Sequence, residues 1–215
     1  MTERNKPNKP RAVIHVDLDG ASHIYAHHGW SYPYSDDPVF ETGMRNLLVF
    51  LEKNRLKATL FVIARDIETP GKRELLAEAA RAGHEIASHS ITHPDFDSLT
   101  LEQKYHELCD SKKMLESELG CPVEGFRAPN FQIDRESFEL LADCGYRYDS
   151  SVFPDHRFSR RLEVPSILPE PYYPLLDNPV AELPLPNRGH ALFPFHPSPG
   201  RKCRCYRFRQ SSIAG

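Results

Sequence analysis

Short apolar segments alternate with helix-length amphipathic segments over residues 12–150, and no hairpin signal interrupts them. Parallel strands need long crossover connections, whereas antiparallel strands are joined by tight turns. The alternation is therefore typical of an α/β protein with a parallel sheet, either a barrel or an open sheet. The expected strands are 12–18, 58–64, 84–87, 123–126 and 146–148, and the expected helices are 41–55, 72–82, 100–119 and 134–143.

The helix ends carry clear stop and start signals. Thr100 followed by Gln103 fits a capping box at the start of the longest expected helix. Gly120 ends that helix, and Gly83 and Gly145 end two others, because glycine readily adopts the left-handed conformation after a last helical turn.

The alternation decays after the fifth expected strand. Prolines crowd residues 154–199, where only 180–185 has the pattern of a strand. We therefore expect a flexible tail at 1–11, one globular domain at 12–200 and a basic tail at 201–215.

Composition narrows the class of partner. The 215 residues carry a net charge of -3, so no basic field predicts nucleic acid as a partner. The strongest apolar segment, 58–64, is far too short to span a membrane.

The first eleven residues are basic and proline-rich without an apolar stretch, which favours a cytoplasmic protein. The five cysteines are scattered and include no C-x-x-C, so we expect reduced thiols.

Chemically capable side chains follow three of the expected strands. Asp17 and Asp19 end the first strand, His89 and His93 follow the third, and Arg127 follows the fourth. The carboxyl ends of parallel strands are where active sites form. Two carboxylates at i and i+2 point to the same side of a strand, and two histidines at i and i+4 meet on one helical turn. Asp19 alone could instead be a turn or cap residue, and Arg127 alone a surface cation.

A second histidine pair competes for the metal. His23 and His27 also have the i, i+4 spacing, and with Asp19 they would lie on one helical face. From the residues alone both sets remain open as metal ligands.

The order of the motifs is more informative than any one of them. D-x-D-G, H-x-x-x-H, R-x-P and the Y-D-S-S of residues 148–151 follow successive strands. This order resembles the polysaccharide deacetylase family, the NodB-homology carbohydrate esterases, over about residues 11–151 and perhaps up to 197. The resemblance implies an α/β fold of the distorted (β/α)7 barrel type, complete or incomplete.

The resemblance also implies roles for individual residues. His89-Ser-Ile-Thr-His93 matches the family's second motif, so Asp19, His89 and His93 are the implied metal ligands. Leu18 stands where the family usually has its catalytic base, and Asp17 takes that role in a D-x-D subgroup. Arg127 is implied to orient the base. His196, within F-P-F-H-P, is the candidate general acid.

The implied reaction is metal-dependent hydrolysis of a non-peptide amide bond, with acetate removed from an N-acetylated sugar of a polysaccharide or its precursor. Zinc is the first choice of metal, and cobalt, nickel or manganese also suit such ligands. One alternative is a cytoplasmic hydrolase of a small linear or cyclic amide or ureide, and another is a catalytically silent carbohydrate-binding protein. A shortened barrel raises the hypothesis of a homo-oligomer. The aromatic residues Tyr25, Trp30 and Tyr32 are candidates for stacking on a sugar, or for ordinary loop packing.

Overall fold

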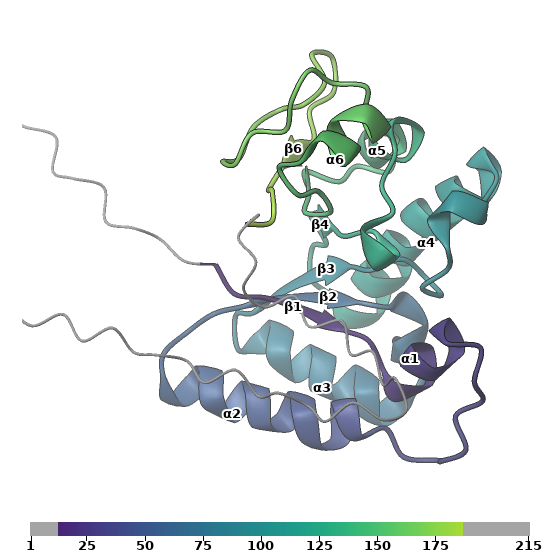
Figure 1. The fold of residues 1–215 in the computed structure, drawn as a ribbon. Helices are drawn as coiled ribbons and strands as arrows, with labels where there is room; N and C mark the ends of the chain where they lie inside the picture. The colour runs from purple at the N-terminus through teal and green to yellow at the C-terminus, as the bar shows by residue number, and fades with distance from the viewer. Residues whose placement is uncertain (1–12, 187–215) are drawn as a thin grey trace, which may run out of the picture.

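The computed structural model describes residues 13–186, which form one six-stranded parallel sheet with helices packed against it (Figure 1). The strands are β1 (His15–Leu18), β2 (Thr59–Val62), β3 (Glu85–Ser88), β4 (Gly125–Phe126), β5 (Tyr148–Asp149) and β6 (Ala181–Glu182). Every strand pairs in parallel with the next strand along the chain.

The strand order explains the architecture. Spatial order β1 to β6 follows chain order without reversal, which is the arrangement of a barrel and not of a doubly wound open sheet. Within residues 13–186, β6 does not pair back to β1, so the barrel is open. The expectation of an α/β fold of the (β/α) barrel type is confirmed.

The helices follow the strands as expected, with boundaries that differ by a few residues. The larger ones are α2 (Arg45–Lys53), α3 (Pro70–Arg81), α4 (Leu101–Leu119) and α5 (Arg135–Asp143). In α4 both hydrogen bonds of the Thr100–Gln103 capping box are present, and Gly120 ends the helix at a φ of 64°. Two short helices were not expected, α1 (Ala21–His27) and α6 (His156–Arg161). One-turn elements complete the connections: η1 (Val39–Met44), η2 (Ala64–Glu68), η3 (Phe96–Ser98) and η4 (Pro129–Phe131).

The core forms where the sheet meets the helices. All four residues of β2 are buried, because this strand is covered on both faces, and such strands have continuous apolar sequences. Figure 1 shows α2 and α3 below β1, β2 and β3, where Leu51 and Leu76 are completely buried. The packed helices therefore support the sheet, and the loops extend from the carboxyl edge of the sheet.

Gly125 in β4 allows a close approach across the sheet. A β-carbon at this position would lie 2.1 Å from Cζ of Tyr148, so any larger residue would collide with the ring. The Tyr148 hydroxyl donates a hydrogen bond of 2.9 Å to Glu85 Oε1, which ties β5 to β3 across β4.

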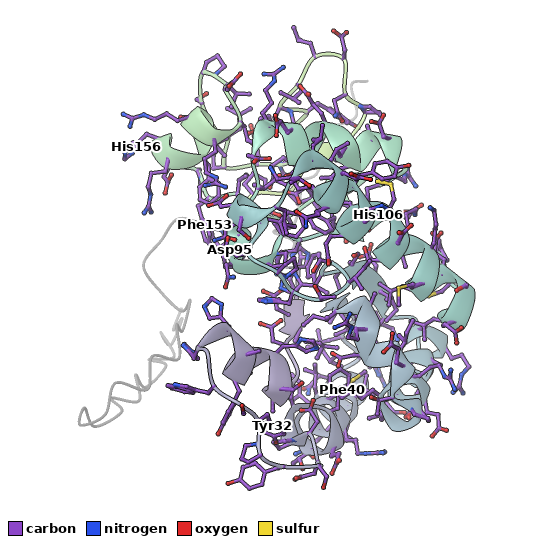
Figure 2. The ribbon with its side chains drawn as sticks, turned by 90° about the vertical axis from the view of Figure 1, so that its right-hand side faces the viewer. Tyr32, Phe40, Asp95, His106, Phe153 and His156 are labelled. Atoms are coloured by element: carbon purple, nitrogen blue, oxygen red, sulfur yellow. A yellow bond between two sulfur atoms is a disulfide. The ribbon has the colours of Figure 1, made fainter. Side chains whose placement is uncertain are left out.

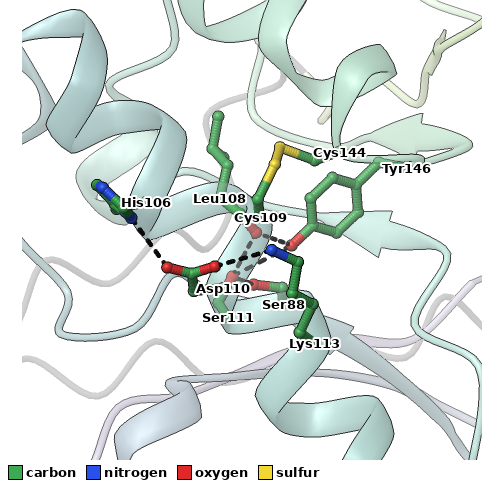
Figure 3. Close-up of a disulfide and its surroundings, with 9 residues drawn as sticks. All are labelled: Ser88, His106, Leu108, Cys109, Asp110, Ser111, Lys113, Cys144 and Tyr146. Carbon is green, nitrogen blue, oxygen red and sulfur yellow. Dashed lines mark hydrogen bonds and ion pairs between the residues drawn. A yellow bond between two sulfur atoms is a disulfide. The ribbon is translucent and has the colours of Figure 1, made fainter.

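A disulfide joins Cys109 of α4 to Cys144 at the end of α5 (Figure 3). The expectation of reduced thiols is therefore wrong for these two residues, whereas Cys121 is free. The bridge spans 35 residues, and closing a loop of that length stabilises a fold by about 3–4 kcal/mol in the chain-entropy model. Beside it the Tyr146 hydroxyl donates to the Leu108 carbonyl at 2.8 Å. Disulfides persist mainly in oxidising compartments, so this pair is an observation against the cytoplasmic location expected from the sequence.

No helix within residues 13–186 is both long and apolar enough to cross a membrane. This agrees with the absence of a long apolar segment in the sequence.

Candidate metal centre

Asp19 is the first residue after β1, at the carboxyl edge of the sheet. Its Oδ1 atom is buried and has no hydrogen-bond partner. An unpartnered buried carboxylate oxygen is costly unless a cation lies beside it. Burial raises the pKa of Asp19, which is the effect expected of a carboxylate removed from water without its counter-ion.

His89 follows β3 directly and is buried. Its Nδ1 lies 2.7 Å from the backbone carbonyl of Arg127, which can only accept a hydrogen bond, so Nδ1 carries the proton. The lone pair of His89 is therefore on Nε2, which lies 3.5 Å from Asp19 Oδ1. A backbone acceptor that holds one ring nitrogen is the usual support of a metal-binding histidine.

His93 reaches the same place through a loop and not through the helical turn expected from its spacing. Ser90 and His93 have positive φ angles of 69° and 57°, which break any helix here, so that expectation is wrong. Glu107 of α4 holds the loop by accepting hydrogen bonds from the backbone N–H groups of Ile91 at 2.7 Å and Thr92 at 3.1 Å. The loop geometry is thus fixed by α4.

The three side chains converge. His93 Nε2 lies 3.8 Å from Asp19 Oδ1, and one ligand atom from each of Asp19, His89 and His93 lies within 4.8 Å of the other two. Ligand atoms around a tetrahedral zinc ion are about 3.3 Å apart, so a small contraction would suit a metal. Burial, together with the neighbouring histidines, lowers the pKa of His93 to about 3, and a neutral imidazole is the form that binds metal.

The competing histidine pair is not part of this group. His23 Nε2 lies 3.5 Å from Asp66 Oδ1, and the His27 ring stands 6.5 Å from the His93 ring, centroid to centroid. Among residues 13–186, Asp19, His89 and His93 form the one cluster of three metal-ligating side chains at this separation.

Arg127 fixes Asp17 beside the cluster. Its Nη1 donates to Asp17 Oδ1 at 2.6 Å, and its Nε donates to the Ser150 carbonyl at 2.7 Å. Its guanidinium lies 4.0 Å from the centroid of the Phe61 ring. Arg127 is only 3% exposed, so the surface-cation alternative is wrong for this residue. A buried planar guanidinium with several partners can hold a carboxylate in one orientation.

His15 belongs to the same network, although the sequence analysis did not single it out. Its Nδ1 accepts a hydrogen bond of 2.9 Å from Arg127 Nη2. Burial and the nearby Arg127 charge lower the pKa of His15 to about 4, so the ring is neutral and can accept. The signal in the sequence was its place two residues before Asp17, on the same side of β1.

The sequence of this chain matches one known protein family. The model of the polysaccharide deacetylase family matches residues 34–148, more than half of the chain. This chain belongs to the polysaccharide deacetylase family. The resemblance inferred from the motif order is confirmed.

Relatives in the family include enzymes named for polymeric substrates. A peptidoglycan deacetylase of Helicobacter pylori is 29% identical over 147 residues, covering 64% of this chain and 47% of that protein. Chitin deacetylase 1 of Cryptococcus neoformans var. grubii is 31% identical over 117 residues, covering 54% of this chain and 24% of that protein. The chain thus spans less than half the length of these two relatives.

Solved structures support the fold. A provisionally assigned polysaccharide deacetylase of Mycobacterium smegmatis aligns with a TM-score of 0.61 at 24% identity, covering 80% of this chain and 57% of that one. An allantoinase aligns with a TM-score of 0.60 at 14% identity, covering 80% of this chain and 60% of that one. A family 4 pseudoenzyme from Bacillus anthracis aligns with a TM-score of 0.50 at 20% identity, covering 66% and 43%. At these identities the likeness concerns the fold alone.

The D-x-D motif of this family member has a structural explanation. Leu18 is 3% exposed and packs in the apolar core, so it offers no polar group to the metal cluster. Asp17, on the opposite face of the strand, points to Arg127. His196, the candidate general acid, lies outside the described residues.

Two buried carboxyl groups lie behind Arg127, at the ends of β5 and β6. Asp149 accepts hydrogen bonds from the Ser151 hydroxyl at 2.6 Å and the Ser151 N–H at 2.9 Å. Glu182 beside it is completely buried. Burial, with the Asp149 charge as a second cause, raises the pKa of Glu182 well above its usual value. Burial therefore favours the protonated, uncharged form of Glu182.

This pair predicts a pH-dependent stability. Because burial raises the pKa of Glu182 in the folded state, the unfolded chain loses this proton at a lower pH than the folded protein does. The free energy of unfolding is therefore unaffected below the unfolded-state pKa and falls as the pH rises toward the folded-state pKa. Glu182→Gln should remove that loss, so its free energy of unfolding relative to the wild type should rise by up to about 1.4 kcal/mol per pH unit in this window. Denaturant unfolding at pH 5 to 8 measures it, with exposed Glu170→Gln as a control that should show no trend. Parallel curves for all three proteins would contradict the raised pKa of Glu182.

Proposed function

We propose that this chain is a metal-dependent hydrolase that removes acetyl groups from N-acetylated sugars of a polysaccharide or its precursor. One observation carries the proposal: in a member of this family, three metal-ligating side chains converge beside a carboxylate held by a buried arginine. The names of the relatives, which refer to peptidoglycan and chitin, support a glycan as the substrate.

The donor set suits a divalent metal. Asp19, His89 and His93 offer one oxygen and two nitrogens, and the buried Asp19 Oδ1 lacks any other partner. Three protein ligands leave a coordination position open, as in catalytic zinc sites. Zinc is our first choice, and cobalt, nickel and manganese also accept such ligands. A metal bound there would supply Lewis-acid chemistry by acidifying water and polarising the substrate carbonyl.

The protein residues would divide the remaining work. Asp17 would accept the proton of the attacking water, because its carboxylate is held next to the cluster by Arg127. Arg127 and its partner His15 would keep that carboxylate in one orientation throughout. His196 remains our proposal for the group that protonates the departing amine.

Acetate release tests the proposal. The chain is stripped of metal with a chelator, reloaded separately with zinc, cobalt, nickel or manganese, and incubated with N-acetylchitopentaose or with peptidoglycan fragments. We expect acetate only after reloading. Hydrolysis of a cyclic ureide without any acetate would favour the small-amide alternative, and sugar binding without turnover would favour a silent binding protein. Either outcome would overturn the deacetylase proposal.

A further inference from the structure

The loop of residues 89–93 carries two of the three candidate metal ligands, and its backbone is strained. Ser90 and His93 have φ angles of 69° and 57°, in the left-handed region that residues other than glycine rarely adopt. Such residues persist only where the surrounding structure holds them in place. The direction of the His93 side chain follows its backbone, so a loop that relaxed to ordinary φ angles would move this ring.

Glu107 of α4 holds the loop with both of its carboxylate oxygens. Its Oε2 accepts hydrogen bonds from the backbone N–H groups of Ile91 at 2.7 Å and Thr92 at 3.1 Å. Its Oε1 accepts another from the Thr92 hydroxyl at 2.8 Å. Hydrogen bonds to a charged acceptor are roughly twice as strong as those between neutral groups. A glutamate within a helix usually faces water, whereas Glu107 is half-buried against the two residues directly before His93.

The part of α4 that carries Glu107 is itself fixed to its neighbours. Ser111 Oγ lies 2.8 Å from Ser88 Oγ, which ties α4 to the end of β3. The disulfide of Cys109 ties the same part of α4 to α5 (Figure 3). In Figure 2, His106 marks the turn of α4 that carries Glu107. The carboxylate therefore extends from a rigid element, which is the kind of support that a precise site needs.

The other connections of the loop hold different atoms. The backbone of η2 donates hydrogen bonds to the carbonyl groups of Ser90 and Ile91, at 2.9 and 3.1 Å. Among the described residues, Glu107 is the one side chain that accepts from the N–H groups of Ile91 and Thr92. Its removal would leave both N–H groups without a protein partner.

We propose that Glu107 is a positioning residue of the metal centre. Its carboxylate fixes the loop in the conformation that brings His93 to the other two ligands, and it thereby determines how tightly the metal is held. Both oxygens of Glu107 are engaged by the loop, so it acts on the metal through His93 and is not a fourth ligand. The inference rests on the metal-dependent function proposed above and adds to it a residue outside the ligand set.

The metal affinity of the folded protein tests this role. We expect Glu107→Ala to weaken zinc binding about tenfold to a hundredfold, the usual effect of losing a group that orients a metal ligand from outside. Glu107→Gln should stay close to the wild type, because the amide oxygen can accept from both N–H groups and the amide nitrogen can donate to the Thr92 hydroxyl. Competition with a chelating dye measures the dissociation constants.

Two controls accompany these variants. Glu118→Ala changes a glutamate of the same helix whose partner is Arg73 at the surface, and its zinc affinity should match the wild type. Thermal unfolding of the metal-free proteins shows whether each variant folds. Equal losses of affinity in Glu107→Ala and Glu118→Ala, or no rescue by Glu107→Gln, would show a general effect on α4 and overturn the proposal.

A variant on the loop side tests the same contact without changing α4. Thr92→Val removes one of the three hydrogen bonds and should weaken zinc binding a few-fold. Added to Glu107→Ala, it should weaken binding no further, because the partner of the hydroxyl is already gone. An unchanged affinity in Thr92→Val, or losses that add in full, would contradict the positioning role.

These measurements are independent of acetate release. If Glu107→Ala weakens zinc binding and Glu107→Gln restores it, but the wild type releases no acetate, the positioning role stands and the deacetylase proposal fails. If the wild type releases acetate but Glu107→Ala binds zinc as tightly, the deacetylase proposal stands and the positioning role is wrong.

Discussion

Replacing His89 by alanine is expected to abolish metal binding and to lower acetate release by about a thousandfold or more. The lost metal would have contributed several kcal/mol of transition-state stabilisation. The ring nitrogen that faces Asp19 disappears, and two ligands remain where a catalytic site needs three. Metal content by elemental analysis and acetate release measure the two effects independently.

His27→Ala is the matched control for that change. His27 belongs to the competing D-x-x-x-H-x-x-x-H pattern, and its side chain is outside the converging cluster. We expect this variant to keep its metal. Because His89 is buried, thermal unfolding of both variants shows whether the fold persists. Metal retained in His89→Ala but lost in His27→Ala would reverse our assignment.

Replacing Asp17 by asparagine is expected to lower kcat by about 10²–10⁴, the usual contribution of a positioned general base. Asparagine has nearly the same shape and its amide oxygen can still accept the hydrogen bond from Arg127, so the site should keep its geometry. Metal stoichiometry should therefore be unchanged. This separates Asp17 from the ligands, whose loss removes metal and activity together.

Two other outcomes of Asp17→Asn would contradict the assignment of Asp17 as the base. Activity near the wild-type level would show that another group takes the proton. Loss of metal in Asp17→Asn would show that Asp17 is a ligand, in contradiction to the cluster seen here.

The order of strands and helices could be predicted from the sequence because it depends on local patterns. The apolar run of β2, the capping box at Thr100 and the glycine at 120 are each determined by residues within one turn or strand. The short helix α1 was missed, since its apolar residues do not define a face and Ala21 is its only buried residue. The disulfide was missed because Cys109 and Cys144 are 35 residues apart and nothing in their spacing pairs them.

The candidate site, like the fold, could be predicted only in part from the sequence. Residue order alone brought Asp19, His89 and His93 to the same sheet edge, because parallel strands place their carboxyl ends together. Side-chain direction could not be derived so simply. His93 arrives through a loop with two left-handed residues, and not on a helical turn, and Glu107 holds this loop at Ile91 and Thr92. His15 meets Arg127, and Lys72 meets Asp37, across segments that are far apart in the sequence.

The amino-acid pattern was enough to predict a parallel α/β sheet and to name the motifs at its carboxyl edge, since periodicity and strand direction are short-range properties. Tertiary structure alone decided which histidines meet Asp19, which carboxylate Arg127 holds, and which helix supports the loop that carries His93. Those outcomes depend on packing between residues up to 110 positions apart, as between Asp17 and Arg127, and no local rule encodes such contacts.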